Sequence, residues 1–186
     1  MGKDSLAGYI RFLSLTFAGL FAGFVNGVLV FELSLRNYDG SVYTQVRQVE
    51  LDHLDTLASA TLIPALITTA ILVALAARGR GRAFWLSLAA LVLLVTVFVL
   101  TLIVNLPING DQAGWSVTAP PADWAGIRDR WQIAHAVRTV AAVLAFALLA
   151  AAAVVHAKQP FPRRSPVDRS QPDRSAPARA YRGGQR

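Results

Sequence analysis

The chain has 186 residues, of which 54% are hydrophobic, and its mean hydropathy is +0.45. This composition is too apolar for an ordinary soluble domain, and the polar stretches are too short to enclose a soluble core. The formal net charge of +7 would favour nucleic-acid binding in a soluble protein. The absence of cysteine excludes disulfides, thiolate metal sites and cysteine nucleophiles.

Four stretches are long enough to cross a bilayer as helices, since about 20 apolar residues suffice. They are residues 12–31, 56–77, 83–104 and 139–155. With a cytoplasmic N-terminus, 13 of the 18 lysines and arginines lie inside and the other 5 lie outside. This bias accounts for the positive charge, so we expect no nucleic-acid partner. The sequence predicts an all-α integral membrane four-helix bundle in the cell membrane, with both termini cytoplasmic.

The first span carries Gly19, Gly23 and Gly27 at four-residue intervals. Small residues spaced in this way let helix backbones approach closely where lipid supplies no hydrophobic drive for association. Packing within the bundle explains the pattern, and a homo-oligomer formed through this face is the alternative.

Residues 36–40 have the composition of a turn, and Ser41 is placed to cap a new helix. Helical periodicity then continues without a break into the second span. One face contains Val42, Val46, Val49, His53 and Leu57. Another contains Ser41, Gln45, Gln48, Asp52 and Asp55. We therefore expect an extracytoplasmic helical extension before the second span.

The third span is followed by a loop, after which Pro120 and Pro121 are predicted to start the next helix, giving a short loop-helix before the fourth span. The predicted transmembrane domain covers residues 1–157. Residues 158–186 are rich in Pro, Arg, Ser, Asp and Gln, which predicts a disordered basic cytoplasmic tail lying against anionic membrane lipids.

A stripe of unusual side chains precedes the fourth span, at steps of four, three, four and three: Trp124, Arg128, Trp131, His135 and Arg138. These spacings place them on one helical face. Each has a structural explanation as well, since tryptophans populate membrane interfaces and arginines form ion pairs. His135 is the hardest to explain structurally, because an ionisable group near the membrane core is costly and usually faces a cavity or partner.

The other outer helix ends also carry polar residues: Glu32 on the first, His53 on the second, and Asn105 and Asn109 on the third. A four-helix bundle brings such ends within about 10 Å of one another. The extracytoplasmic half of the bundle is therefore the predicted functional region.

Several of these motifs together resemble a known family of small four-helix membrane proteins. They are Asn105-Leu-Pro107-Ile-Asn109, Trp115, Pro120-Pro121-Ala-Asp123-Trp124, Arg128, Trp131, His135 and Arg138. The run resembles the anthrone-oxygenase-like family, much of which was catalogued as a domain of unknown function. The resemblance covers roughly residues 8–157. It implies oxidation of an anthrone to an anthraquinone with dioxygen.

That reaction requires a base, a donor for the developing oxyanion and a flat aromatic slot. His135 suits the base, and Arg138 with Asn105 or Asn109 suits the oxyanion. The slot for an apolar small molecule arriving from the membrane is assigned to Trp115, Trp124, Arg128 and Trp131. No cofactor is expected, because the anthrone carbanion reacts with oxygen without flavin or haem.

Two alternatives use the same region differently. Glu32, His53 and His135 would form a two-histidine, one-carboxylate set of the kind that holds non-haem iron, or copper, although no short spacing motif joins them. The other alternative is a small membrane protein without enzymatic activity, whose polar cluster binds a lipid, a quinone or a partner subunit.

Overall fold

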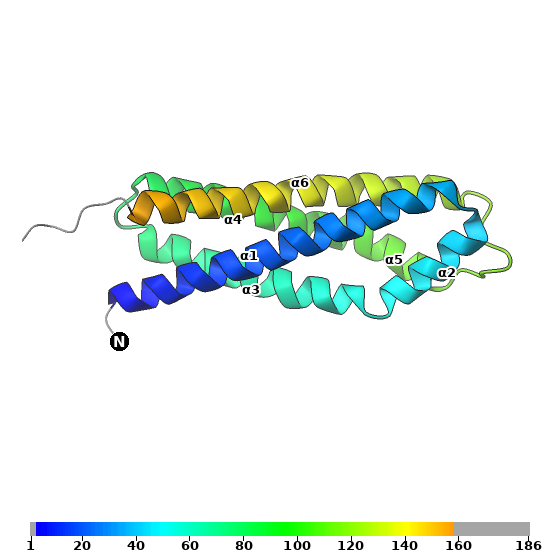
Figure 1. Cartoon of the computed structure of the whole chain (residues 1–186), viewed down its shortest axis with the longest axis horizontal. Coiled ribbons are helices and arrows are strands. Elements are labelled where there is room, and N and C mark those ends of the chain that lie inside the picture. Colours follow the sequence, from blue (N-terminus) through cyan, green and yellow to red (C-terminus); the bar gives the residue numbers. More distant parts are fainter. Residues whose placement is uncertain (1–2, 158–186) are drawn as a thin grey trace, which may run out of the picture.

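The computed structural model describes residues 3–157, which form an all-helical bundle (Figure 1). The long helices are α1 (Lys3–Ser34), α3 (Leu54–Ala76), α4 (Arg82–Leu100) and α6 (Trp124–Ala157). Shorter elements are η1 (Leu35–Asn37), α2 (Gly40–Leu51), the π-helical segment η2 (Thr101–Asn105) and α5 (Leu106–Ala113). Four helices are long and apolar enough to cross a membrane. The predicted all-α fold with four candidate spans is confirmed, and the tail predicted at 158–186 lies outside the described residues.

The four long helices pack in a closed ring, in which α1 contacts α3 and α6, and α4 contacts the same two helices. Both ends of the described chain lie at one end of the bundle, and α2 and α5 lie at the other (Figure 1). We call the latter the α2 end. Many large apolar side chains on the outer faces of the long helices are exposed, as expected of surfaces that meet lipid.

The core away from the α2 end is built from small residues and a few larger ones. Ala65, Ala90, Ala142 and Ala145 are fully buried where helices meet. Alanines let backbones approach closely, and dispersion contacts then hold the helices together in an apolar solvent. One polar pair crosses this part of the bundle, since the hydroxyls of Ser14 on α1 and Thr69 on α3 lie 2.7 Å apart.

The helix expected to run unbroken from Ser41 into the second span is divided in two, so that prediction is wrong. Asp39 is the N-cap of α2 and accepts a hydrogen bond from the Val42 amide at 3.0 Å. The chain turns at residues 52–53, and His53 has φ −135° and ψ −31°, outside the helical region. The break lets α2 lie across the end of the bundle rather than extend α3.

The third long segment also departs from a regular helix. Pro107 has no amide hydrogen and its ring crowds the carbonyl four residues earlier, and the chain accommodates it by the π-helical turn η2. Helix α5 then continues to Ala113 with Asn105, Asn109 and Gln112 buried. The prolines at 120–121 precede the last helix, which begins at Trp124 rather than at the prolines themselves.

Candidate functional site

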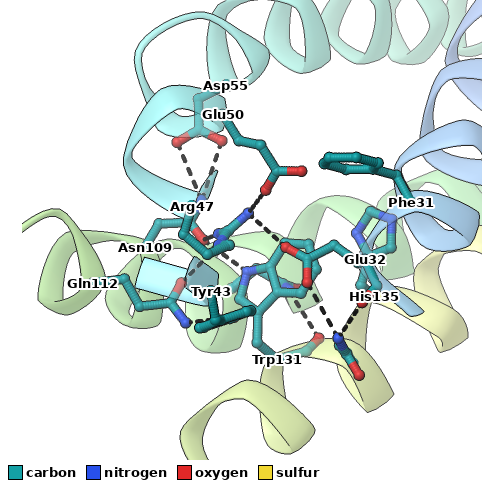
Figure 2. A network of polar contacts seen from close by, with 12 residues as sticks. Phe31, Glu32, Tyr43, Arg47, Glu50, Asp55, Asn109, Gln112, Trp131 and His135 are labelled. Atoms are coloured by element: carbon teal, nitrogen blue, oxygen red, sulfur yellow. Dashed lines mark hydrogen bonds and ion pairs between the residues drawn. The ribbon is translucent and has the colours of Figure 1, made fainter. Parts of the chain in front are cut away.

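Helix α2 turns its polar face toward the bundle. Its buried side chains include Tyr43, Thr44, Arg47 and Glu50, whereas Val42 and Val49 on the opposite face are exposed. This inverts the arrangement of an ordinary amphipathic helix. Buried polar groups need partners, and Tyr43 and Arg47 find theirs on α1 and α5, with a cation–π contact to α6 (Figure 2).

Arg47 is the centre of this network. Its Nη1 lies 2.5 Å from Glu50 Oε2 and 3.0 Å from Glu32 Oε1. Its Nε donates to Gln112 Oε1 at 3.0 Å, and its Nη2 donates to Asn109 Oδ1 at 2.9 Å. The side chain is 3% exposed, so the guanidinium is compensated by protein groups instead of water.

The two carboxylates on Arg47 have different surroundings. Glu32 also accepts a hydrogen bond from Gln132 Nε2 at 3.2 Å and does not line the central cavity. Glu50 lines the cavity, and its buried Oε1 has no hydrogen-bond partner among the described residues. Burial, and then the nearby Glu32 charge, raise the pKa of Glu50 above its usual range against the opposing effect of Arg47. Its raised pKa and its unpaired oxygen make Glu50 a candidate for proton transfer at the cavity.

Asn109 joins the network to the other helices. Its Oδ1 also accepts from Trp131 Nε1 at 2.7 Å, and its Nδ2 lies 3.1 Å from each carboxylate oxygen of Asp55. The Trp131 ring lies under the Arg47 guanidinium, with 4.3 Å from Cζ to the ring centroid. These contacts fix both Trp131 and Arg47.

His135 and Arg138 form a second, deeper unit. His135 Nε2 lies 2.9 Å from the Val25 carbonyl oxygen, which can only accept, so Nε2 carries the hydrogen. His135 Nδ1 then accepts from Arg138 Nη2 at 2.8 Å, and the imidazole stacks on Trp131 with 4.7 Å between ring centroids. Both ring nitrogens are therefore occupied. In this geometry His135 orients Arg138 and has no free lone pair with which to accept a proton from substrate.

Arg138 also donates from Nη1 to Thr101 Oγ1 at 2.9 Å. Its buried Nε has no hydrogen-bond partner, and no carboxylate forms a salt bridge with it, among the described residues. Glu32, the carboxylate on the first span, pairs with Arg47 and not with Arg138. Arg138 is a buried cation with unused donor capacity.

These two units face one cavity of about 140 Å³ in the α2-end half of the bundle. Its walls are mainly apolar and include Phe21, Phe24 and Phe98. Its charged, hydrogen-bonding and aromatic polar residues are Arg47, Glu50, Asp55, Ser59, Thr101, Asn109, Trp131, His135 and Arg138. An apolar chamber with a few convergent polar groups is the usual form of a small-molecule site.

The structure brings some of the predicted site residues together and separates others. His135, Arg138, Asn109 and Trp131 line the cavity. Asn105 is buried beside it, and its Nδ2 lies 3.4 Å from the Trp131 carbonyl oxygen. The other three predicted substrate-binding residues do not line it: Trp115, Trp124 and Arg128.

Those three residues organise the cap of the bundle. Trp124 packs on Tyr43 with 5.6 Å between ring centroids, and Arg128 Cζ lies 5.0 Å from the Trp124 ring centroid. Gly40 accommodates this tryptophan, because a Cβ there would lie 2.8 Å from Trp124 Nε1. The Trp115 carbonyl accepts a hydrogen bond from Gln48. Their position supports a role in holding α2 in place.

The predicted metal ligands are not assembled. His53 is exposed at the start of α3, whereas Glu32 and His135 are buried. Within residues 3–157, no group of three histidine, aspartate or glutamate side chains is arranged to hold a metal ion.

Sequence reasoning missed Arg47 and Glu50. The signal was the third face of α2, on which Tyr43, Arg47 and Glu50 are spaced by four and three. A charged pair at that spacing looks like an exposed i,i+3 contact unless the helix is known to lie across the bundle.

One comparison with known proteins finds a match. The model of the family described as anthrone oxygenase matches residues 55–148, which contain Asp55, Asn105, Asn109, Trp131, His135 and Arg138. Glu32, Arg47 and Glu50 lie before the matched residues. No curated protein and no solved structure matches the chain. Because the match spans half of the sequence, the chain belongs to the anthrone oxygenase family.

Proposed function

We propose that the protein oxidises an apolar polycyclic substrate of the anthrone type with dioxygen at the cavity of the α2-end half, whose volume of about 140 Å³ receives the reacting edge of such a molecule and not all of its rings. The observation that carries this proposal is that Glu50, a carboxylate with an unpaired buried oxygen, and Arg138, a guanidinium with an unpaired buried Nε, both line one mainly apolar chamber. The family of the chain and its four apolar helices support the same assignment.

The reaction needs little from the protein beyond proton transfer and charge stabilisation. An anthrone CH₂ flanked by aryl rings loses a proton, and the resulting enolate gives its electrons to dioxygen to form a carbon–oxygen bond. The resulting peroxide anion takes up a proton to become a hydroperoxide, which then loses water and leaves the second carbonyl. One anthrone and one dioxygen thus yield one anthraquinone and one water.

Glu50 is the proposed base. Its raised pKa makes Glu50 a stronger base than an exposed glutamate, and therefore better matched to a weakly acidic CH₂. Its Oε1 has no hydrogen-bond partner and is available for the proton. Arg138, held by His135 and Thr101, is the proposed donor to the enolate oxygen, because an oriented cation in an apolar site stabilises developing negative charge strongly. This assigns His135 a positioning role.

We propose that no resident metal or organic cofactor takes part, because an enolate of this type reacts with dioxygen directly. Metal analysis of protein purified without chelator tests this point. Stoichiometric iron or copper that is required for turnover would overturn it.

Oxygen uptake by the protein in lipid nanodiscs with anthrone, corrected for spontaneous oxidation, tests the function. Glu50→Gln is expected to lower turnover by about 10²–10⁴-fold while the protein still folds. Glu32→Gln is the matched control, since it neutralises the other carboxylate on Arg47 but does not face the cavity. Equal losses in the two variants would reduce Glu50 to a structural role, and no turnover in the wild type would contradict the oxygenase function.

We also propose that the end opposite α2 is cytoplasmic, as the distribution of lysine and arginine favours, so that the cavity lies in the outer half of the membrane. The chain has no cysteine, so single cysteines report topology cleanly. Gly114→Cys should react with an impermeant maleimide added outside intact cells, and Gly79→Cys should not. The reverse pattern would overturn the orientation.

A further inference from the structure

Beside the central cavity lies a recess at the surface, between α1 and the junction of α2 with α3. Gly23, Gly27 and Phe31 of α1 line only this recess. Four further residues line both the recess and the central cavity: Phe24, Val28, Glu50 and Leu54. The Glu50 side chain therefore lines both the central cavity and the recess.

Two glycines line this recess without being required by packing. A Cβ placed at Gly23 or Gly27 would meet no atom within 4 Å. Gly19, one turn earlier, differs, because a Cβ there would lie 3.1 Å from the Phe146 ring of α6. Packing within the bundle thus explains Gly19, but it leaves Gly23 and Gly27 unexplained.

The recess opens on a face that meets lipid. It lies within a candidate membrane span, and Leu20, Val30 and Phe31 on the same helix are exposed. The Phe31 ring lies beside the Glu50 carboxylate at the edge of the recess (Figure 2). A buried carboxylate behind a lipid-facing gap is expensive to maintain, which points to use by a ligand.

We propose that the substrate reaches the cavity sideways from the bilayer, through the gap at Gly23 and Gly27, with Phe31 at its rim. The passage suits a flat apolar polycyclic molecule whose acidic C–H edge arrives first at Glu50. This inference rests on the proposed function for the identity of the substrate, but the route itself can be tested without turnover.

Filling the gap should slow access without removing the catalytic groups. Gly27→Leu and Gly23→Leu are expected to lower kcat/KM by about tenfold or more at low substrate content of the nanodisc, equivalent to about 1.4 kcal/mol in the barrier. Gly27→Ala should have a smaller effect in the same direction. Gly8→Leu is the matched control, since Gly8 is also an open glycine of α1 but does not line the recess.

A second readout uses anthracene, which absorbs the fluorescence of tryptophan but lacks the acidic CH₂. Energy transfer also reaches anthracene in the surrounding lipid, so the part of the Trp131 quenching that saturates with anthracene content, with Trp131→Phe as background, reports filling of the cavity, and its time course gives the rate. Slower filling in Gly27→Leu, with Gly8→Leu unchanged, is the expected result, whereas equal rates would overturn the lateral route even if anthrone is oxidised.

Failure of the function and failure of the route are thus separable. If anthracene filling is slowed but anthrone is not oxidised by the wild type, the passage stands and the oxygenase function falls. Nanodiscs holding one copy test the alternative of a homo-oligomer formed through Gly19, Gly23 and Gly27. Filling that is unaffected by Gly27→Leu, together with turnover seen only in two-copy discs, would assign the recess to a second chain and overturn the proposal.

Discussion

The two halves of this bundle pack their helices together with different kinds of side chain. In the half away from α2, the long helices meet through alanines and aliphatic side chains, and the Ser14–Thr69 pair is the polar contact between α1 and α3. At the α2 end, the helices meet through a network that centres on Arg47 and reaches five helices. Buried charges are costly in a membrane protein, and an apolar contact would hold the helices together at lower cost. The difference indicates that the apolar half maintains the fold and the polar half is retained for function.

Arg47→Met should break this division most severely. It leaves Glu32 and Glu50 as buried carboxylates without their cation, and removing one partner of a buried pair typically costs about 3–5 kcal/mol. We expect a large fall in unfolding free energy, measured in detergent or by steric trapping in lipid, together with loss of turnover. Arg130→Met is the control, because Arg130 is exposed and forms no salt bridge with any residue of the described range, so its loss should cost little. Equal effects would mean that the α2-end network is not what holds this region.

The pH dependence of Glu50 should separate function from stability at the α2 end. Its pKa is raised above the ordinary 4.5 by burial and Glu32, so turnover should rise with pH through an inflection above 4.5, as the base loses its proton. Stability should move the other way. A folded state that holds the proton more tightly than the unfolded state loses stability as pH rises above 4.5. Glu50→Gln should remove the pH dependence above 4.5 from both the turnover profile and the stability profile. If the inflection in turnover is the same in the wild type, Glu32→Gln and Glu50→Gln, the titrating group is not Glu50.

The sequence predicted the apolar half well because hydropathy and length decide it. An apolar stretch long enough to cross a bilayer has few alternatives to a helix, since lipid offers no hydrogen-bond partner for unpaired backbone groups. The α2 end was predicted only in part. His135, Arg138, Asn109 and Trp131 share helical faces that the sequence reveals, and they line the cavity.

Other features of the α2 end depend on where the chain bends, which periodicity does not report. The turn at residues 52–53 lays α2 across the bundle and thereby buries Arg47 and Glu50, whose positions in the sequence look like those of a solvated helix. Trp124 and Arg128 continue the stripe of His135 by spacing, but α6 extends beyond the cavity, so they contact Tyr43 and each other. A shared helical face fixes direction but not depth.

A cavity made in the apolar half should weaken the fold without altering chemistry. Leu94 is fully buried among the alanines of the core, so Leu94→Ala removes packing that the surrounding helices only partly restore. Because lipid is as apolar as the core, only the packing part of the usual cost applies, and we expect about 2 kcal/mol. Turnover divided by the amount of folded protein should match that of the wild type. A specific loss of turnover would mean that the two halves are mechanically coupled.

The smallest effects allow the closest comparison, between a buried and a partly buried hydroxyl that each make one interhelical hydrogen bond. Ser14 bonds Thr69 in the apolar half at 2.7 Å, and Thr101 accepts from Arg138 at the α2 end at 2.9 Å. Ser14→Ala and Thr101→Val should each cost about 0.6 kcal/mol of stability, the average for such bonds in membrane proteins. Only Thr101→Val should also lower kcat, by severalfold, because Arg138 then keeps His135 as its one side-chain partner and loses its fixed orientation. Similar kcat values for the two variants would show that the Thr101 hydrogen bond does not orient Arg138. The distinction between a structural half and a functional half would then rest on Arg47 and Glu50.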